Sequence, residues 1–305
     1  MLYGCLRADW EVGVSEQIVG ILGARSFVGS CLLSRLVELG HRPVAFSRTK
    51  REEADNGVIW KQTPESDGIQ NASGEPDAIP CWICVAPIWV LPAHFAWLEA
   101  CGVRKIVALS STSRFTKDQS IDAEEQLLAK RLADAEAQVQ QWAERLGIEW
   151  VILRPTLIYG LKRDKNVSEI ARFICRFGFF PVFGLAQGLR QPIHAQDVAN
   201  ACVLALATDQ GSHCAYNISG GEVLSYRNMV TRVFVALGRR PRTLTLPFWV
   251  FRFAVALVRC IPRYRHLSVA MAERMNRDLV FDHSHAARAL GFIPRQFTLS
   301  KEDLP

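Results

Sequence analysis

The chain has 305 residues, of which 49% are hydrophobic and 22% are charged, and its formal net charge is +6. This composition is typical of a folded globular protein and argues against intrinsic disorder, and the length allows one large α/β domain or a main domain with a smaller lobe. The positive charge is spread along the sequence, which suits an anionic ligand such as a nucleotide but does not form a nucleic-acid-binding surface.

The first residues and the cysteines indicate where the protein works. The first 17 residues carry four charges and no long apolar run, so we predict neither a signal peptide nor a membrane span there. We expect residues 1–16 to be a disordered extension or an artefact of start-codon choice. The nine cysteines lie mostly in apolar runs, and their odd number favours a reducing cytoplasm. Cys81 and Cys84 have the C-x-x-C spacing, but no second Cys or His pair completes a site, so we predict no metal.

Apolar strand-like runs alternate with helix-like segments through the first half of the chain. The predicted strands are 17–22, 43–47, 58–60, 79–86, 104–109 and 148–153, and the predicted helices are 28–39, 91–100 and 121–146. Residues 63–76, rich in Gly, Ser, Asp and Pro, are a predicted loop. The alternation predicts right-handed βαβ units, and the continuous apolar strands are typical of a sheet buried on both faces. We therefore predict an α/β, Rossmann-type fold with a doubly wound, mostly parallel sheet.

The second half has a looser rhythm. Its predicted helices are 166–177, 197–207, 226–237 and 248–260, with short strands near 190–193 and 215–218. We expect a dinucleotide-binding core over 17–160, and we expect 161–305 to complete the sheet and form a smaller C-terminal substrate lobe, the two being interleaved as one unit.

One late apolar stretch raises the question of a membrane. Leu246–Ile261 is interrupted by Arg252 and Arg259 and is too short and too charged to span a bilayer. We expect a helix packed over the substrate cleft. The alternative is a peripheral helix that lies on a membrane surface, since aromatic residues surround its arginines.

The first predicted strand runs directly into a glycine-containing turn and a helix. Gly23 permits a tight turn, small residues at 24 and 26 let the backbone approach a pyrophosphate, and Gly29 lets the helix pack closely on the strand. The helix start offers free N–H groups and a partial positive charge to phosphates. The predicted dinucleotide-binding residues are Gly23, Ala24, Arg25, Ser26, Phe27, Val28 and Gly29.

The end of the second strand indicates which dinucleotide is bound. An acidic residue there would bind the ribose hydroxyls of NAD, but this chain has the basic sequence Ser-Arg-Thr-Lys-Arg at 47–51. Arg48 and Arg25 could hold a 2′-phosphate through charge-assisted hydrogen bonds. The sequence therefore favours NADP over NAD.

Five further segments complete a family pattern. They are Val-Ala-Leu-Ser-Ser-Thr at 107–112, Ile-Leu-Arg-Pro-Thr-Leu-Ile-Tyr-Gly at 152–160, Gln-Pro-Ile-His-Ala-Gln-Asp-Val-Ala at 191–199, Tyr-Asn-Ile-Ser-Gly-Gly at 216–221 and Leu-Gly-Phe-Ile-Pro at 290–294. Together with the glycine turn, they make the chain resemble the extended or atypical short-chain dehydrogenases/reductases. The resemblance is to the NAD-dependent epimerase/dehydratase group, which includes many nucleotide-sugar enzymes, and it extends over 17–297.

The resemblance implies roles for several residues. Ser111 or Thr112 would be the catalytic hydroxyl, and Val85, Ala86 and Pro155 would lie at the cofactor. Tyr159 would shape the substrate pocket.

The basic residues suggest where a diphosphate would bind. Arg190, and Arg163 or Lys165 in the basic loop after Gly160, are the candidates for holding such a group.

The catalytic Tyr-x-x-x-Lys pair of the family is incomplete. No tyrosine lies on the predicted helix 121–146. If Ala133-Asp134 corresponds to the Ala-Glu pair that follows the family's lysine, Lys130 takes the position of that lysine. Gln126 then replaces the tyrosine, and its amide cannot exchange protons near neutral pH. Aligning Ala135-Glu136 instead puts Leu132 at the lysine and Leu128 at the tyrosine.

Other groups near this helix could supply the acid or base. Glu124, Glu125, Lys117 and the pair Ser113-Arg114 are the candidates, although such side chains are more often solvated. His194 and Asp197 could form a catalytic pair, but we expect Asp197 to cap the following helix and His194 to end a strand.

Two functions remain open. The first is an NAD(P)-dependent oxidoreductase or epimerase that acts on a nucleotide sugar or a similar small carbonyl or hydroxyl substrate. The second is a non-catalytic NAD(P)(H)-binding sensor, assembly factor or accessory protein, as the missing tyrosine would suggest. A homodimer through the helix 121–146 is usual for the family, and no nucleic-acid partner is expected.

Overall fold

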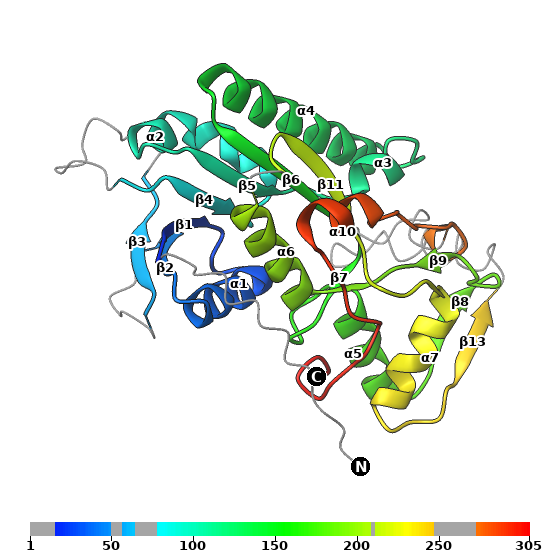
Figure 1. Ribbon diagram of the computed structural model, residues 1–305. Helices are drawn as coiled ribbons and strands as arrows, with labels where there is room; N and C mark the ends of the chain where they lie inside the picture. Colours follow the sequence, from blue (N-terminus) through cyan, green and yellow to red (C-terminus); the bar gives the residue numbers. More distant parts are fainter. Residues whose placement is uncertain (1–15, 50–56, 65–77, 209–210, 247–272) are drawn as a thin grey trace, which may run out of the picture.

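A seven-stranded parallel sheet forms the centre of the larger lobe (Figure 1). The computed structural model describes residues 16–49, 57–64, 78–208, 211–246 and 273–305. The strand order is β11-β6-β5-β4-β1-β2-β3, so the chain winds outward from β1 in both directions. The strands are β1 (Ile18–Leu22), β2 (Arg42–Ser47), β3 (Ile59–Gln62), β4 (Cys81–Cys84), β5 (Lys105–Leu109), β6 (Glu149–Pro155) and β11 (Cys214–Ile218). The predicted α/β, Rossmann-type fold is confirmed.

Helices cover both faces of this sheet (Figure 1). On β6, Val151 and Leu153 belong to one apolar cluster while Trp150 and Ile152 belong to another, as expected for a strand buried on both sides. The first cluster includes α1 (Phe27–Glu38), α6 (Ala195–Ala207) and α10 (Ser284–Leu290). The second includes η1 (Ile88–His94), α2 (Phe95–Ala100) and α4 (Ala123–Leu146).

A smaller lobe lies beside the carboxyl end of the sheet and has its own apolar core. It contains α5 (Val167–Phe177) and α7 (Tyr226–Ala236). Three short strand pairs complete it: β7 (Ile158–Tyr159) with β10 (Ile193–His194), β9 (Leu189–Arg190) with β12 (Leu224–Ser225), and β8 (Phe180–Phe183) with β13 (Thr243–Leu246). Because β11, α6 and α10 return to the large sheet, the second half of the chain contributes to both lobes.

Three local predictions need correction. The predicted helix 91–100 is split into η1 and α2, since Pro92 lacks an N–H and disturbs a continuous α-helix. A short helix, α3 (Ser113–Thr116), follows β5 and was not predicted.

The cap of α6 is His194, whose Nδ1 accepts a hydrogen bond from the Gln196 amide at 3.2 Å. Asp197 does not cap the helix but accepts hydrogen bonds from Arg295.

Some predictions fall on residues whose placement is not described. These are nearly all of the expected extension 1–16, most of the loop 63–76, the helix 248–260, and all but the first residue of Leu246–Ile261. Among the described residues, every helix is too short or too polar to cross a membrane. The same part of the chain contains no group of three or more His, Cys, Asp or Glu side chains suited to a metal ion.

Candidate functional site

The turn between β1 and α1 packs directly against the end of β4. Gly23 has a φ of +84°, and a Cβ placed on it would lie 2.3 Å from the backbone nitrogen of Ala86. A Cβ on Gly29 would lie 2.5 Å from the carbonyl oxygen of Ala24. Both contacts are far too short for a side chain, so both positions require glycine. The Ser26 hydroxyl accepts from the Gly29 amide at 3.0 Å and caps α1.

This turn has the features of a dinucleotide-phosphate site. Amides of the first helical turn, including those of Phe27 and Val28, have no acceptor within the helix and, with the helix dipole, favour an anion. The close approach of the β4 end to Gly23 makes the cradle narrow, as a dinucleotide requires. The Val85 amide donates to the Leu22 carbonyl at 2.8 Å, so it supports the turn rather than offering a donor to a ligand.

Arg25 links the glycine turn to the end of β2. Its guanidinium donates to the Thr49 hydroxyl at 2.7 Å. The neighbouring Arg48 is exposed, and its carbonyl accepts from the Gln62 side chain at 3.3 Å. The structure therefore brings Arg25 beside the basic loop that contains Arg48, where the adenosine ribose of a dinucleotide would lie.

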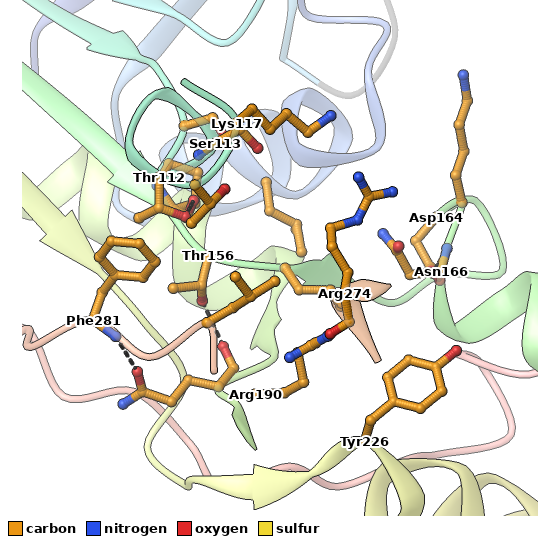
Figure 2. A pocket seen from close by; sticks show the side chains of 18 of the residues that line it. Thr112, Ser113, Lys117, Thr156, Asp164, Asn166, Arg190, Tyr226, Arg274 and Phe281 are labelled. Carbon is orange, nitrogen blue, oxygen red and sulfur yellow. Dashed lines mark hydrogen bonds between the residues drawn. The ribbon is translucent and has the colours of Figure 1, made fainter. Parts of the chain in front are cut away.

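A cavity of about 670 Å³ opens next to the glycine turn, between the carboxyl ends of β5 and β6 and the smaller lobe (Figure 2). Phe27, at the start of α1, is part of its wall. Five cationic side chains line the cavity, namely Lys117, Arg163, Lys165, Arg190 and Arg274. The one acidic residue in the described lining, Asp164, is buried and accepts hydrogen bonds from Asn166 and Ser168. The cavity is therefore suited to an anionic ligand.

The predicted hydroxyls lie in the wall of this cavity. Thr112 donates its side-chain O–H to the Pro155 carbonyl at 3.1 Å, which joins the ends of β5 and β6. The Ser111 hydroxyl accepts from the Ser113 amide at 3.1 Å. Ser111, Thr112 and Pro155, all expected at the site, are thus brought together.

Arg190 lies at the opposite end of the cavity and is almost fully buried (Figure 2). It donates to the carbonyls of Leu189 and Arg277, each at 2.8 Å, and to the carbonyl of Arg274. Its guanidinium also lies 5.6 Å from the centre of the Tyr226 ring. Burial lowers the pKa of Arg190 to about 10 and raises the pKa of Tyr226 to about 12. Arg190 therefore fixes the 274–277 segment against the cavity.

Arg163 joins the smaller lobe to the glycine turn. Its guanidinium donates to the Arg25 carbonyl at 2.7 Å and to the Ser30 hydroxyl at 3.0 Å. The preceding residues Leu161 and Lys162 both have positive φ, so the loop turns sharply to present Arg163 there. Arg163 lies on the boundary between the cofactor turn and the cavity.

Lys117 and Arg274 share one carboxylate. Glu125 accepts a hydrogen bond from Arg274, and its carboxylate oxygen lies 3.4 Å from Nζ of Lys117. Burial would raise the pKa of Glu125, but the Ser120 hydroxyl, Arg274 and Lys117 together lower it. Arg274 and Tyr226 were missed in the sequence because neither belongs to a motif, and both reach the cavity from segments remote in the chain.

Two predicted site residues lie away from the cavity. Tyr159 is fully buried in the smaller lobe, where its hydroxyl donates to the Thr298 carbonyl at 3.0 Å and burial raises its pKa to about 12. Lys130 lies on the outer face of α4, 71% exposed, with its Nζ 2.7 Å from Asp134. The structure thus corrects both placements.

The C-terminal segment is fastened to the smaller lobe by a buried carboxylate. Asp303 accepts from Leu161, Ser300 and His194, whose Nε2 is 3.1 Å away. Burial alone would raise the pKa of Asp303, but these hydrogen bonds lower it below its ordinary value. The contribution of Asp303 to stability is therefore present above the unfolded-state pKa and is lost as the pH falls through the folded-state pKa.

We expect Asp303→Asn to lower the free energy of unfolding at pH 7 by about 2 kcal/mol, because the hydrogen bonds to a charged acceptor are weakened. The difference from the wild type should shrink below about pH 4, where the wild-type carboxyl also becomes protonated. Urea unfolding at several pH values measures it. A difference that does not change with pH would contradict this assignment.

The comparisons with known proteins agree with this geometry. Residues 94–219 match the model of the NAD dependent epimerase/dehydratase family. Over these residues the chain is similar to that family. It is 23% identical over 181 residues to a UDP-glucose 4-epimerase from Vibrio cholerae, an alignment that covers 59% of this chain and 52% of that protein. The chain spans about half the length of the curated relatives it matches.

Solved structures of epimerases share the fold. UDP-glucuronic acid 4-epimerase from Bacillus cereus, in complex with NAD, superposes with a TM-score of 0.67 at 16% identity, covering 94% of this chain and 95% of the other. UDP-glucose 4-epimerase from Thermotoga maritima, with UDP-glucose, gives a TM-score of 0.64 at 16% identity, covering 94% and 96%. At these identities the likeness concerns the fold alone.

The structure also distinguishes the two possible alignments of α4 with the family's Tyr-x-x-x-Lys pattern. Glu136 is buried, and Arg154 donates to its carboxylate at 2.6 Å, whereas Asp134 is exposed. Ala135-Glu136 is therefore the pair that faces the sheet. In that alignment Leu132, which is buried, takes the position of the family's lysine, and Leu128 takes that of its tyrosine.

Proposed function

We propose that the chain binds NAD(P)(H) at the Gly23–Gly29 turn and a nucleotide sugar in the adjoining cavity, and that it transfers hydride between them as an oxidoreductase or epimerase-like enzyme. One observation carries the proposal. A cavity lined by five cationic side chains and by Ser111 and Thr112 opens directly beside a turn that requires glycine at two positions.

The chemistry of the cavity supports a diphosphate-linked substrate. Arg274 and Lys117 share the carboxylate of Glu125, and Arg163 extends from the loop after β7 to the glycine turn. Guanidinium and ammonium groups bind phosphate oxygens through charge-assisted hydrogen bonds. The UDP-sugar epimerases that share the fold act on ligands of this class by their names.

The bound dinucleotide would supply the hydride acceptor or donor at its nicotinamide ring. Ser111 would hold the reacting oxygen of the substrate, since it lines the cavity and its hydroxyl accepts from the Ser113 amide, which leaves its own proton to donate. The Thr112 hydroxyl proton is already donated to the Pro155 carbonyl. With leucine at both positions of the α4 pair, the proton must come from another group. Among the alternatives considered from the sequence, Lys117 lines the cavity, close to Thr112 and Ser113 (Figure 2). We propose Lys117 as the proton donor to that oxygen.

Replacing Lys117 by methionine tests this role. We expect kcat to fall about 100-fold, the usual size of a general acid–base contribution, with the enzyme still able to bind dinucleotide. Lys130→Met is the matched control on the exposed face of α4 and should keep wild-type kcat. Turnover that is lost with Lys130→Met and retained with Lys117→Met would reverse the assignment.

A second function has an observation of its own. In the alignment with Ala135-Glu136, Leu128 and Leu132 stand where the family has the tyrosine and the lysine. A protein that only binds NAD(P)(H) needs neither of these catalytic groups. Assays of UDP-, GDP- and dTDP-sugars with oxidised and reduced dinucleotides distinguish the two functions. Turnover of any of them establishes an enzyme, whereas stoichiometric dinucleotide binding without turnover supports a sensor or accessory protein.

We propose NADP(H) as the preferred dinucleotide, because the Arg25 guanidinium reaches Thr49 at the end of β2, next to the exposed Arg48. Arg48→Ala should weaken NADPH binding about tenfold, the loss of one charge-assisted hydrogen bond, and leave NADH binding unchanged. Titration with both dinucleotides measures the ratio. Equal affinities of the wild type for NADH and NADPH would contradict the preference.

The cytoplasmic location and the homodimer through residues 121–146 are further proposals. Sedimentation of the purified chain tests the dimer directly.

A further inference from the structure

The end of the smaller lobe carries exposed aromatic and arginine side chains on adjoining elements. This surface, here called the arginine–aromatic surface, consists of Arg176, Phe177, Phe179, Arg240, Arg242 and Leu244. Its members come from the end of α5, the residue before β8, and β13 with the residues before it. In Figure 1 β8 and β13 lie at the end of the molecule away from β1–β5.

Contacts within the lobe make the surface continuous. The Arg176 guanidinium lies 5.2 Å from the Phe177 ring, and the Phe177 and Phe179 rings are 6.5 Å apart. The Arg242 carbonyl accepts from the Phe180 amide at 2.9 Å, which fixes β13 beside β8. Phe179, Arg242 and Leu244 also line a shallow hollow of about 410 Å³.

The surface exposes apolar side chains next to its arginines. Phe177 is 52% exposed and Leu244 is 49% exposed. They lie among the exposed side chains of Arg176, Arg240 and Arg242. Exposed aromatic and leucine side chains interspersed with arginines are the pattern of a protein surface that rests in the headgroup region of a membrane.

The three charged members of the surface, Arg176, Arg240 and Arg242, are all cationic and exposed. The neighbouring Arg172 and Arg232 are paired with Glu169 and Glu222 and do not add to this charge. Such a cluster is attracted to anionic lipids by about 1 kcal/mol for each basic residue near the bilayer. A free phosphate would not account for the exposed phenylalanine and leucine, whereas a bilayer would bind both kinds of side chain.

We propose that the arginine–aromatic surface binds the surface of an anionic lipid bilayer. The bound chain would lie against the membrane through its smaller lobe, with Phe177 and Leu244 entering the headgroup region and the three arginines contacting lipid phosphates. This inference does not depend on the reaction that the cavity performs.

Co-sedimentation of the full chain with vesicles tests it. We expect binding to vesicles that contain phosphatidylglycerol and much weaker binding to phosphatidylcholine alone, with binding reduced by salt. Arg240→Glu combined with Arg242→Glu should weaken partitioning at least about 30-fold. Phe177→Ser should weaken it with the charge unchanged.

Matched controls separate this surface from general charge and hydrophobicity. Arg145→Glu with Lys301→Glu makes the same charge change at exposed positions elsewhere, and Ile293→Ser removes another exposed apolar side chain. Both should bind as the wild type does. The proposal is overturned if the wild type does not bind anionic vesicles. It is also overturned if the Arg240/Arg242 variant binds as well as the wild type, because the contact would then lie elsewhere in the chain. Equal affinity for single-stranded RNA at the same salt would also overturn it.

Discussion

Replacing Glu136 by glutamine is expected to lower the free energy of unfolding by about 3–5 kcal/mol, because it removes the charge of a buried carboxylate that pairs with two partly buried arginines. Glu136 is 3% exposed. It accepts hydrogen bonds from Ser110, Arg114 and Arg154, the last through two nitrogens. This carboxylate joins α4, the end of β5 and β6 directly beneath the hydroxyls of the cavity.

Urea unfolding followed by far-UV circular dichroism measures the loss. Glu144→Gln is the matched control, since it changes an exposed glutamate near the end of the same helix. We expect the control to lie within about 0.5 kcal/mol of the wild type. A similar small effect for Glu136→Gln would show that the arginines find other partners and that the cluster does not fix α4 on the sheet.

Replacing Gly29 by valine is expected to abolish dinucleotide binding. Any Cβ at this position would lie 2.5 Å from the Ala24 carbonyl oxygen and 2.7 Å from the Gly23 carbonyl oxygen, both of them backbone atoms that cannot rotate away. The start of α1 must therefore move from the turn. The loss of two amide–phosphate hydrogen bonds corresponds to about 100-fold or more in affinity.

Ser34→Val provides the comparison for Gly29→Val. It introduces the same β-branched side chain at an exposed position of α1 and should leave NADPH affinity within about twofold of the wild type. If Gly29→Val does not fold, the smaller substitution Gly29→Ala serves as the test, and thermal unfolding shows whether that variant is folded. Wild-type affinity in Gly29→Ala would mean that the dinucleotide does not approach this turn.

The sheet and the glycine turn could be predicted because their causes are local. Val151 to Leu153 form an apolar run in sequence because both faces of β6 are covered by helices. Gly23 and Gly29 are required by backbone contacts made within the turn and with the adjacent strand. Spacing along the chain was enough to find both features.

The cavity was harder to predict because its charges come from distant segments. Arg274 and Tyr226 lie far along the chain from Thr112, and only the packing of the smaller lobe brings them together. Lys130 shows a second limit. Spacing alone allowed two alignments of α4, and the choice depends on which side chain faces the sheet, which the buried Glu136 reveals.

The same limit applies to side chains at the end of a strand. The motif that ends in Tyr159-Gly160 contributes several residues to the cavity wall, but successive residues of β7 point to opposite sides. Ile158 lines the cavity and Tyr159 enters the core of the smaller lobe. The resemblance pointed to Tyr159 as the residue that faces the ligand, and the structure places Ile158 there instead.

Titration of the purified chain with NADPH and NADH, followed by calorimetry, tests the central claim most directly. We predict saturable binding of one dinucleotide per chain, tighter for NADPH, and its loss in Gly29→Val with Ser34→Val unaffected. Failure of both dinucleotides to bind a folded wild-type chain at millimolar concentration would contradict the assignment of the Gly23–Gly29 turn.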